Sequence, residues 1–268
     1  MLKPLALALA LCAPAAAEEA PARVVSMNLC TDQLAMALAA PGQLLAVSWL
    51  ARDPRSSLMA AEAQRWPVLR GLAEEIYLLH PDLVLADSYS GRATVEMLRR
   101  LGVRVATIEQ ARSLDDVRAA LLEMGRLLHR EAAAEAMAAA FDDRLAALRQ
   151  EGGPRPLAAT YAANGYMAGD ESLPGDTVRA AGYEDLSGRL GLASGGMLPL
   201  ELLLMAEPDL LITGARYPGR SRAEDILLHP ALAALPSRKV EIDDRDWLCG
   251  LPAVLDTVER LARLREAG

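Results

Sequence analysis

The chain has 268 residues, of which 24% are charged and 52% are hydrophobic. This length and composition suit a globular protein with one large domain or two lobes, and they exclude a disordered chain. The formal net charge of -8 leaves no Lys- or Arg-rich face that could displace counterions from phosphates, so nucleic-acid binding is excluded as well.

The first residues, MLKPLALALALCAPAAA, have the layout of a secretory signal peptide. A lysine near the start is followed by an apolar run and then by small residues up to Ala17. We predict a signal peptide over residues 1–17, cleaved near Ala17. Cys12 would suggest a lipid anchor, but Leu11 stands where lipoprotein processing requires a small residue. A soluble exported protein is therefore favoured over an anchored one.

Short β-rich runs alternate with helical patterns in two parts of the chain. The runs are RVVSM, LLAVSW, LVLAD and RVATIE in the first part and LAATYA, LLITG and KVEID in the second. Strands separated by helices indicate parallel βαβ sheets, whose binding loops follow the carboxyl ends of the strands. We therefore predict an N-terminal α/β lobe over residues 23–110 and a C-terminal α/β lobe over residues 153–268.

The segment between the lobes, residues 111–152, has a helical pattern. Apolar residues recur at helical spacing, and Gly125 is the only glycine between Ser113 and Glu151. Ser113 with Asp116 gives a capping signal at its start. We expect one long helix, unbroken or broken once, to join the lobes.

Two stretches of the chain have nearly the same pattern. They are EEIYLLHPDLVLADS, which begins at Glu74, and LELLLMAEPDLLITGA, which begins at Leu200. In each, a helical run meets a Pro-Asp-Leu turn and then a buried-strand pattern, and a glutamate stands seven residues before the proline. Each lobe is thus predicted to carry the same helix–turn–strand unit.

Together with this repeat, the opening RVVSMNLCTDQLAMALAAPGQLLAVSWLARDP and the closing VEIDDRDWLCGLPAVLDTVERLA resemble the periplasmic substrate-binding proteins of iron-siderophore, haem and cobalamin ABC importers. The resemblance covers the whole predicted mature chain and rests on the order and spacing of the motifs. It implies two Rossmann-like α/β lobes joined by one long α-helix, with a groove between them that closes only slightly on a ligand. It also implies a periplasmic monomer that captures a metal chelate and delivers it to a permease and ATPase complex at the inner membrane.

The resemblance gives a role to two acidic residues. Proteins of this family present one exposed acidic residue on each lobe, which docks onto arginines of a two-fold permease, and Glu74 and Glu201 match these positions. The alternative is that both glutamates are solvated first-turn residues that complement a helix dipole. Glu75 beside Glu74 leaves a one-residue ambiguity in the first lobe.

Candidate ligand-binding residues come from the segments that follow predicted strands. They are Cys30, Trp49, Arg70, Asp87, Tyr89, Tyr166, Met197, Arg245, Trp247 and Cys249. Flat aromatic faces suit a macrocycle or an aromatic chelate, and arginines suit its carboxylates or a phosphate. Trp247 has the alternative of packing under the last helix, and Tyr89 that of capping a turn. The expected chelates are, in order of preference, an iron-siderophore, haem and a corrinoid, because the loops hold few aromatic residues to grip a corrin.

Two cysteines, Cys30 and Cys249, remain after the predicted cleavage. Three interpretations are open: a disulfide that pins the lobes across the groove, thiols that line the ligand site, or ordinary buried residues. The histidines His80, His129 and His229 are not paired at metal-ligand spacing, so no site for a bare metal ion is expected.

Two other functions are compatible with an exported α/β chain: a hydrolase-like enzyme, or a ligand sensor without a transport role. The sequence has no G-x-S-x-G nucleophile motif, no Walker motif and no dinucleotide fingerprint. We therefore expect no catalysis and no cofactor. An enzyme would turn its ligand over, whereas a binding protein would take it up unchanged.

Overall fold

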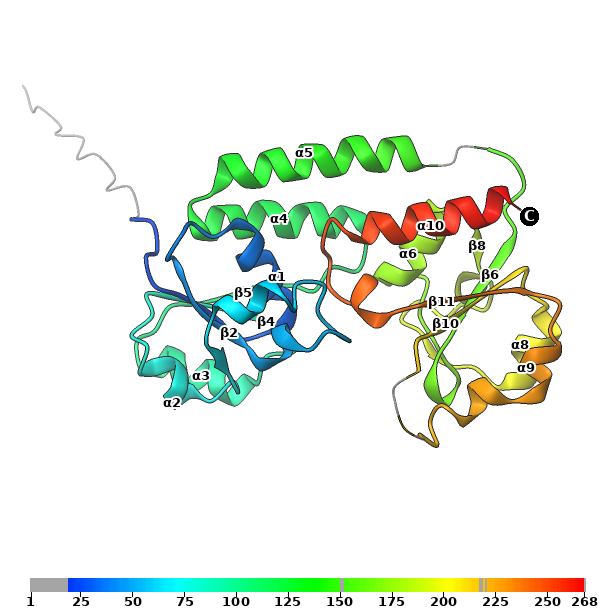
Figure 1. Cartoon of the computed structure of the whole chain (residues 1–268), viewed down its shortest axis with the longest axis horizontal. Helices are drawn as coiled ribbons and strands as arrows, with labels where there is room; N and C mark the ends of the chain where they lie inside the picture. The colour runs from blue at the N-terminus through cyan, green and yellow to red at the C-terminus, as the bar shows by residue number, and fades with distance from the viewer. Residues whose placement is uncertain (1–18, 150–151, 217–218, 220, 268) are drawn as a thin grey trace, which may run out of the picture.

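In a computed structural model, the chain forms two α/β lobes beside a layer of helices (Figure 1). The structure describes residues 19–149, 152–216, 219 and 221–267. The predicted signal peptide lies outside these ranges. Within them, no helix combines the length and the apolar character needed to cross a membrane.

The first lobe is built on a five-stranded parallel sheet with the order β3-β2-β1-β4-β5. Its strands are β1 (Val24–Ser26), β2 (Leu44–Ser48), β3 (Val68–Leu69), β4 (Leu83–Asp87) and β5 (Val105–Ile108). Its helices are α1 (Leu29–Leu38), α2 (Ala73–Tyr77) and α3 (Arg92–Arg100), with short 3-10 turns η1 (Trp49–Arg52) and η2 (Glu62–Arg65). The central strands β1 and β4 are fully buried, which is why they read as continuous apolar runs.

The second lobe is built on a four-stranded parallel sheet with the order β11-β10-β6-β8 and a small antiparallel ribbon, β7-β9. Its strands are β6 (Leu157–Tyr161), β7 (Tyr166–Met167), β8 (Glu184–Asp185), β9 (Gly196–Met197), β10 (Leu210–Gly214) and β11 (Arg238–Ile242). Its helices are α6 (Leu173–Ala180), α7 (Leu186–Arg189), α8 (Leu200–Ala206), α9 (Pro230–Ala234) and α10 (Val254–Glu266), with 3-10 turns η3 (Ala163–Gly165), η4 (Asp225–Leu228) and η5 (Asp244–Asp246). All seven predicted strands are confirmed, and the strands that the sequence did not predict have two residues each.

The connector is a hairpin of two helices, so the expectation of a single unbroken helix is wrong and the alternative with one break is correct. The helices are α4 (Leu114–Leu128) and α5 (Glu131–Leu148), and they lie side by side (Figure 1). The capping box predicted at Ser113 and Asp116 starts α4. The reversal follows His129, whose left-handed backbone ends the helix.

Small residues let the two helices of the hairpin approach closely. A side-chain carbon added at Gly125 of α4 would lie 2.3 Å from the Cβ of Ala134 in α5. Ala134 and Ala138 of α5 are both buried. Only glycine therefore fits at position 125.

The hairpin packs against the cores of both lobes. Leu121 and Met124 of α4 belong to the apolar core under the first lobe's sheet, whereas Leu114 belongs to the core of the second lobe. In α5 the order is reversed, since Ala134 contacts the first core and Phe141 the second. Apolar burial on both sides thus fixes the hairpin to each lobe.

A disulfide makes a further connection between the lobes. Cys30 at the start of α1 is joined to Cys249, with 5.0 Å between their Cα atoms. Cys249 is buried, and together with Leu251 it packs into the core of the first lobe, so the chain after β11 returns there before α10 begins. Of the three interpretations left open by the sequence, the disulfide is the one observed.

Candidate functional site

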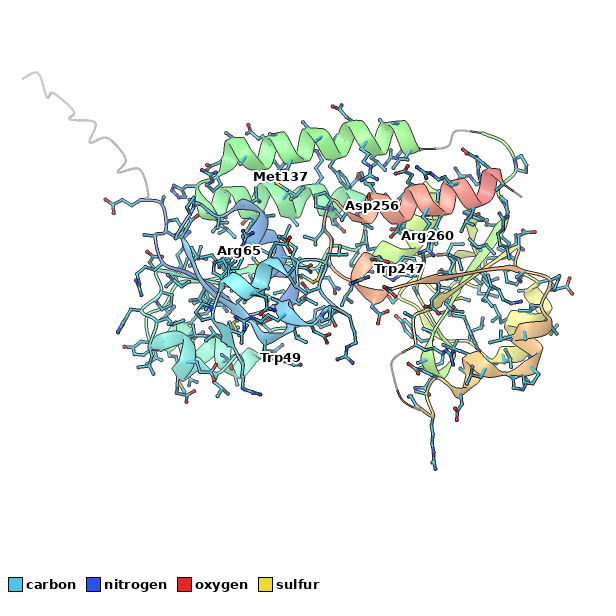
Figure 2. All side chains as sticks on the ribbon, viewed as in Figure 1. Trp49, Arg65, Met137, Trp247, Asp256 and Arg260 are labelled. Atoms are coloured by element: carbon cyan, nitrogen blue, oxygen red, sulfur yellow. A yellow bond between two sulfur atoms is a disulfide. The ribbon has the colours of Figure 1, made fainter. Side chains whose placement is uncertain are left out.

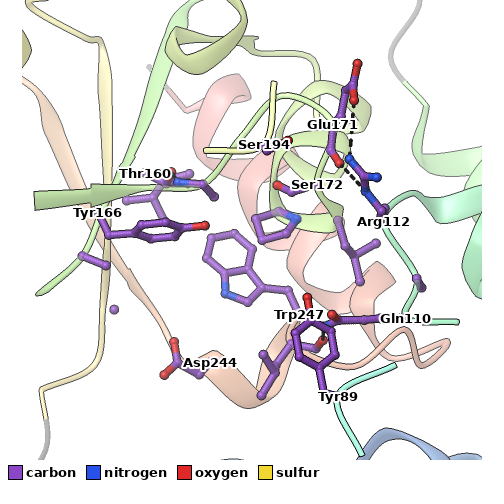
Figure 3. A pocket seen from close by; sticks show the side chains of 18 of the residues that line it. Tyr89, Gln110, Arg112, Thr160, Tyr166, Glu171, Ser172, Ser194, Asp244 and Trp247 are labelled. Carbon is purple, nitrogen blue, oxygen red and sulfur yellow. Dashed lines mark hydrogen bonds and ion pairs between the residues drawn. The ribbon is translucent and has the colours of Figure 1, made fainter. Parts of the chain in front are cut away.

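A cavity of about 660 Å³ lies between the two lobes. Its wall includes Ser88 and Tyr89 from the loop after β4, and Glu109 to Arg112 from the segment that leads into α4. The second lobe contributes its remaining lining, which includes Thr160, Tyr166, Glu171, Ser194 and Trp247 (Figure 3). The loops that follow parallel strands thus meet at this cavity, as the sequence predicts.

Four aromatic residues line the cavity: Tyr161, which is buried, and Tyr89, Tyr166 and Trp247, whose side chains are partly exposed (Figure 3). Tyr89 is 76% exposed, and Tyr166 is 43% exposed, so both rings are free to contact a ligand. Trp247 is half-buried and also packs against the core of the second lobe. Trp247 thus packs against the core and also lines the cavity, and its contact with a ligand stays a prediction.

Asp87 holds the loop that presents Tyr89. Its carboxylate accepts a hydrogen bond from the backbone N–H of Tyr89 at 3.0 Å and another from the hydroxyl of Ser90 at 3.0 Å. Asp87 itself is only 6% exposed and does not line the cavity. In the structure its carboxylate therefore stabilises the turn that carries Tyr89.

The charged groups at the cavity were largely missed by sequence reasoning. The Arg112 guanidinium donates to the backbone carbonyl of Glu171 at 3.1 Å and lies 3.4 Å from its carboxylate. Arg112 lies four residues after the end of β5, in the irregular segment that leads into α4, and Glu171 lies in a loop before α6. The sequence analysis named neither residue as a ligand-binding candidate. Both side chains are more than 60% exposed, which leaves their charges available to a ligand.

Three further polar groups of the wall, on Gln110, Thr160 and Tyr161, are hydrogen-bonded within the protein. The amide Nε2 of Gln110 donates to the carbonyl of Leu248 at 3.2 Å and so ties the first lobe's exit segment to the loop after η5. The hydroxyl of Thr160 accepts from the backbone N–H of Ala168 at 2.9 Å. Burial raises the pKa of the neighbouring Tyr161 phenol, whose hydroxyl donates to the carbonyl of Leu198 at 3.1 Å. These bonds fix the shape of the cavity wall.

The other residues predicted to bind ligand do not line this cavity. Trp49 is 52% exposed on the first lobe, well separated from Trp247 (Figure 2). Arg70 is exposed, and only its backbone N–H is engaged, with Glu75 at 2.9 Å. Met197 is 64% exposed and pairs with Tyr166 in the β7-β9 ribbon.

Arg245 bridges the two lobes. Its guanidinium donates to the backbone carbonyl of Pro54 in the first lobe at 3.0 Å, and it lies 3.2 Å from the carboxylate of Asp243. Cys30 and Cys249, the remaining candidates, are joined in the disulfide. These three residues connect the two lobes directly. The structure does not test the ligand contacts predicted for the ten residues, and those contacts remain predictions.

Within the ranges that the structure describes, no group of three or more His, Cys, Asp or Glu residues is placed to hold a metal ion. His129 ends α4, and the side chain of His229 accepts from the backbone N–H of Ala231 at the start of α9.

Two α/β lobes fixed by a helical hairpin, with an aromatic-lined cavity between them, define a two-lobed ligand-binding protein. The chain belongs to the periplasmic binding protein family, whose sequence model matches residues 24–240. The resemblance drawn from the sequence is thus confirmed. A comparison with curated protein sequences gives no match.

Solved structures share the fold. A periplasmic haem-binding protein from Pseudomonas aeruginosa is 24% identical, with a TM-score of 0.71 over 91% of this chain and 92% of that one. The periplasmic vitamin B12-binding protein of Vibrio cholerae is 18% identical, with a TM-score of 0.71 over 92% and 97%. An ABC-type Fe3+-hydroxamate transport system protein from Saccharomonospora viridis is 20% identical, with a TM-score of 0.67 over 91% and 93%.

Proposed function

We propose that this chain is the solute-binding component of an ABC importer, which captures a metal chelate between its lobes and delivers it to an inner-membrane permease. The observation that carries the proposal is the cavity of about 660 Å³ that Tyr89, Tyr166 and Trp247 line from both lobes. This volume lies within the range of drug-sized and cofactor-sized ligand sites. The chain takes up its ligand unchanged and acts as a monomer.

The chemistry of the wall favours a flat or aromatic ligand that carries anionic groups. Aromatic rings contact such ligands through their faces, and Arg112 supplies a guanidinium that can pair with a carboxylate in place of Glu171. The preferred ligands remain an iron-siderophore, then haem, then a corrinoid. The proteins of similar fold, whose names refer to haem, vitamin B12 and Fe3+-hydroxamate, are consistent with this class.

Export to the periplasm completes the proposal. Residues 1–17 act as a signal peptide that is cleaved near Ala17. Support comes from the Cys30–Cys249 disulfide, because such bonds persist in oxidising compartments outside the cytoplasm.

The proposed contacts to the permease are Glu74 and Glu201. Each is the second residue of its helix, α2 or α8, and each side chain is exposed. Both helices lie on the side of the lobes that faces away from α4 and α5 (Figure 1). One carboxylate per lobe on a common side suits a two-fold partner with arginines on each half.

A fluorescence titration of the mature protein with a ferric siderophore, haemin and cyanocobalamin tests the ligand class. Trp247 lines the cavity and Trp49 does not, so quenching by a bound chelate should persist in Trp49→Phe and be largely lost in Trp247→Phe. Equilibrium dialysis of the same samples measures stoichiometry without optical interference. Tight binding of free metal ions, with no uptake of any of the three chelates, would contradict the proposal.

A further inference from the structure

The repeated helix–turn–strand unit is the same in the two lobes at the level of single residues. Ile76 of α2 and Leu203 of α8, which stand two residues after Glu74 and Glu201, are each 0% exposed. These two side chains anchor the helices to their lobes. The exposed faces of α2 and α8 are therefore oriented alike with respect to their own lobes.

The turns that follow the two helices share one backbone feature, although α2 ends three residues before its turn residue and α8 directly before it. His80 and Glu207, each directly before the proline of the repeat, have positive φ angles of 46° and 44°. Few residues other than glycine adopt this left-handed conformation, so its presence at both positions shows that the two turns follow one design.

The aspartates of the two turns play equivalent parts. Asp82 accepts hydrogen bonds from the backbone N–H groups of Ala22 and Arg23, just before β1. Asp209 accepts from the N–H of Leu157, the first residue of β6. Each unit is thus fixed to the start of a sheet strand, and its exposed face is held rigidly.

The most exposed apolar side chains of these units occupy equivalent positions. Leu78 stands four residues after Glu74 and is 72% exposed, and Met205 stands four residues after Glu201 and is 80% exposed. Met205 lies within α8, and Leu78 is the C-cap of α2 with helical backbone angles, so each shares a helix face with the glutamate four residues before it. Each lobe therefore presents a carboxylate and an apolar side chain together, one helical turn apart.

We propose that Leu78 and Met205 form a matched pair of apolar contacts that insert into the two halves of the permease beside the arginines that receive Glu74 and Glu201. This inference rests on the proposed function, because it names further residues of the same docking surface. A buried apolar side chain next to a charge pair excludes water from the pair and strengthens it. The partner surface that fits is a cationic residue beside an apolar pocket, present once on each half of a two-fold complex.

Charge favours this partner over two others. The lipid surface of a bacterial inner membrane is anionic, and it would repel a face whose apolar side chains stand beside Glu74 and Glu201. A second copy of the chain, paired through the same face, would bring like carboxylates together. Neither a membrane nor a second copy would explain why each lobe carries one complete helix–turn–strand unit.

The test immobilises the permease and ATPase complex in lipid nanodiscs on a sensor surface and measures the rates at which the mature protein binds and dissociates. Leu78→Ala and Met205→Ala should each weaken binding roughly tenfold, and the double variant about a hundredfold, because the two sites are far apart and their effects add. Chelate affinity should not change. The matched control is Leu101→Ala/Leu190→Ala, since these leucines, at the ends of α3 and α7, are 46% and 42% exposed and lie outside the repeated units. The control should bind as the wild type does.

The other outcomes can be distinguished from one another, and three of them overturn the inference. A double variant that binds the permease normally, while Glu74→Ala/Glu201→Ala does not, would leave the proposed function intact and refute the apolar contacts. Equal binding of the wild type to nanodiscs without the complex would identify the membrane as the partner. A dimer of the wild type in light scattering, lost in the double variant, would identify a second copy. If the wild type binds the permease but no chelate, and the double variant loses permease binding, the apolar contacts are supported and the proposed ligand is refuted.

Discussion

Cys30 and Cys249 form a disulfide with 5.0 Å between their Cα atoms, although 219 residues separate them in the sequence. It ties the start of α1 in the first lobe to the segment that leads into α10. Because the bond closes a very long loop, it should restrict the unfolded chain strongly.

We expect Cys30→Ala/Cys249→Ala to lower the free energy of unfolding by about 2–4 kcal/mol. Urea denaturation followed by circular dichroism measures the change. A thiol reductant should destabilise the wild type by a similar amount and leave the double variant unaffected. Equal stability of oxidised and reduced wild type would show that the bond makes no contribution.

The contact between Gly125 and Ala134 predicts a specific packing defect. Gly125→Ala would place a methyl group 2.3 Å from the Cβ of Ala134, so the hairpin must separate, at a cost of about 1–3 kcal/mol in unfolding free energy. The compensating variant Gly125→Ala/Ala134→Gly restores the missing space and should recover part of that loss. If both variants are as stable as the wild type, the two helices are not packed as closely as described.

The aromatic wall of the cavity predicts selective effects on ligand binding. Tyr89→Ala and Tyr166→Ala should each weaken chelate binding about tenfold, because each removes a ring face from the site. Tyr77→Ala is the control, since Tyr77 is also exposed, at 41%, but lies on α2 outside the cavity. Calorimetric titration gives the three affinities. An effect of Tyr77→Ala equal to those of the other two would place the ligand elsewhere.

Asp32 predicts a pH dependence of stability. It is fully buried in α1, and desolvation raises its pKa from 3.8 to about 6, against the opposing hydrogen bonds from Ser48. Because the pKa of the folded protein lies above that of the unfolded chain, the unfolded chain loses this proton first as the pH rises. As the pH rises from about 4 to about 6, the free energy of unfolding should therefore fall by up to about 3 kcal/mol because of Asp32, and this loss persists at higher pH.

Asp32→Asn removes the titrating group, so this loss of stability should be absent from the variant. The control Asp115→Asn makes the same chemical change at an exposed position of α4 and should retain the loss. Urea denaturation at a series of pH values compares the three proteins. A wild type that gains stability relative to Asp32→Asn across this range would show that Asp32 is ionised in the fold.

The sequence predicted the two lobes well because their strands are buried and lie between clear helical patterns. It left the connector undecided because the reversal after α4 contains neither glycine nor proline, and His129 adopts the left-handed conformation without a sequence signal. The hairpin is held by tertiary contacts between α4 and α5, which the periodicity of either helix alone does not reveal.

Prediction of the site was partial for a similar reason. The sequence analysis selected segments that follow predicted strands, and this rule found Tyr89, Tyr166 and Trp247, which line one cavity. Arg112 and Glu171 were missed because they lie in irregular segments whose paths depend on how the two lobes pack.

The central claim is that the cavity between the lobes holds a metal chelate. A crystal structure of the mature protein with the tightest-binding chelate of the titration tests it most directly. The account predicts one chelate per chain, between the lobes, in van der Waals contact with Tyr89, Tyr166 and Trp247. A chelate bound on the outer surface of either lobe, with the cavity free of ligand, would contradict it.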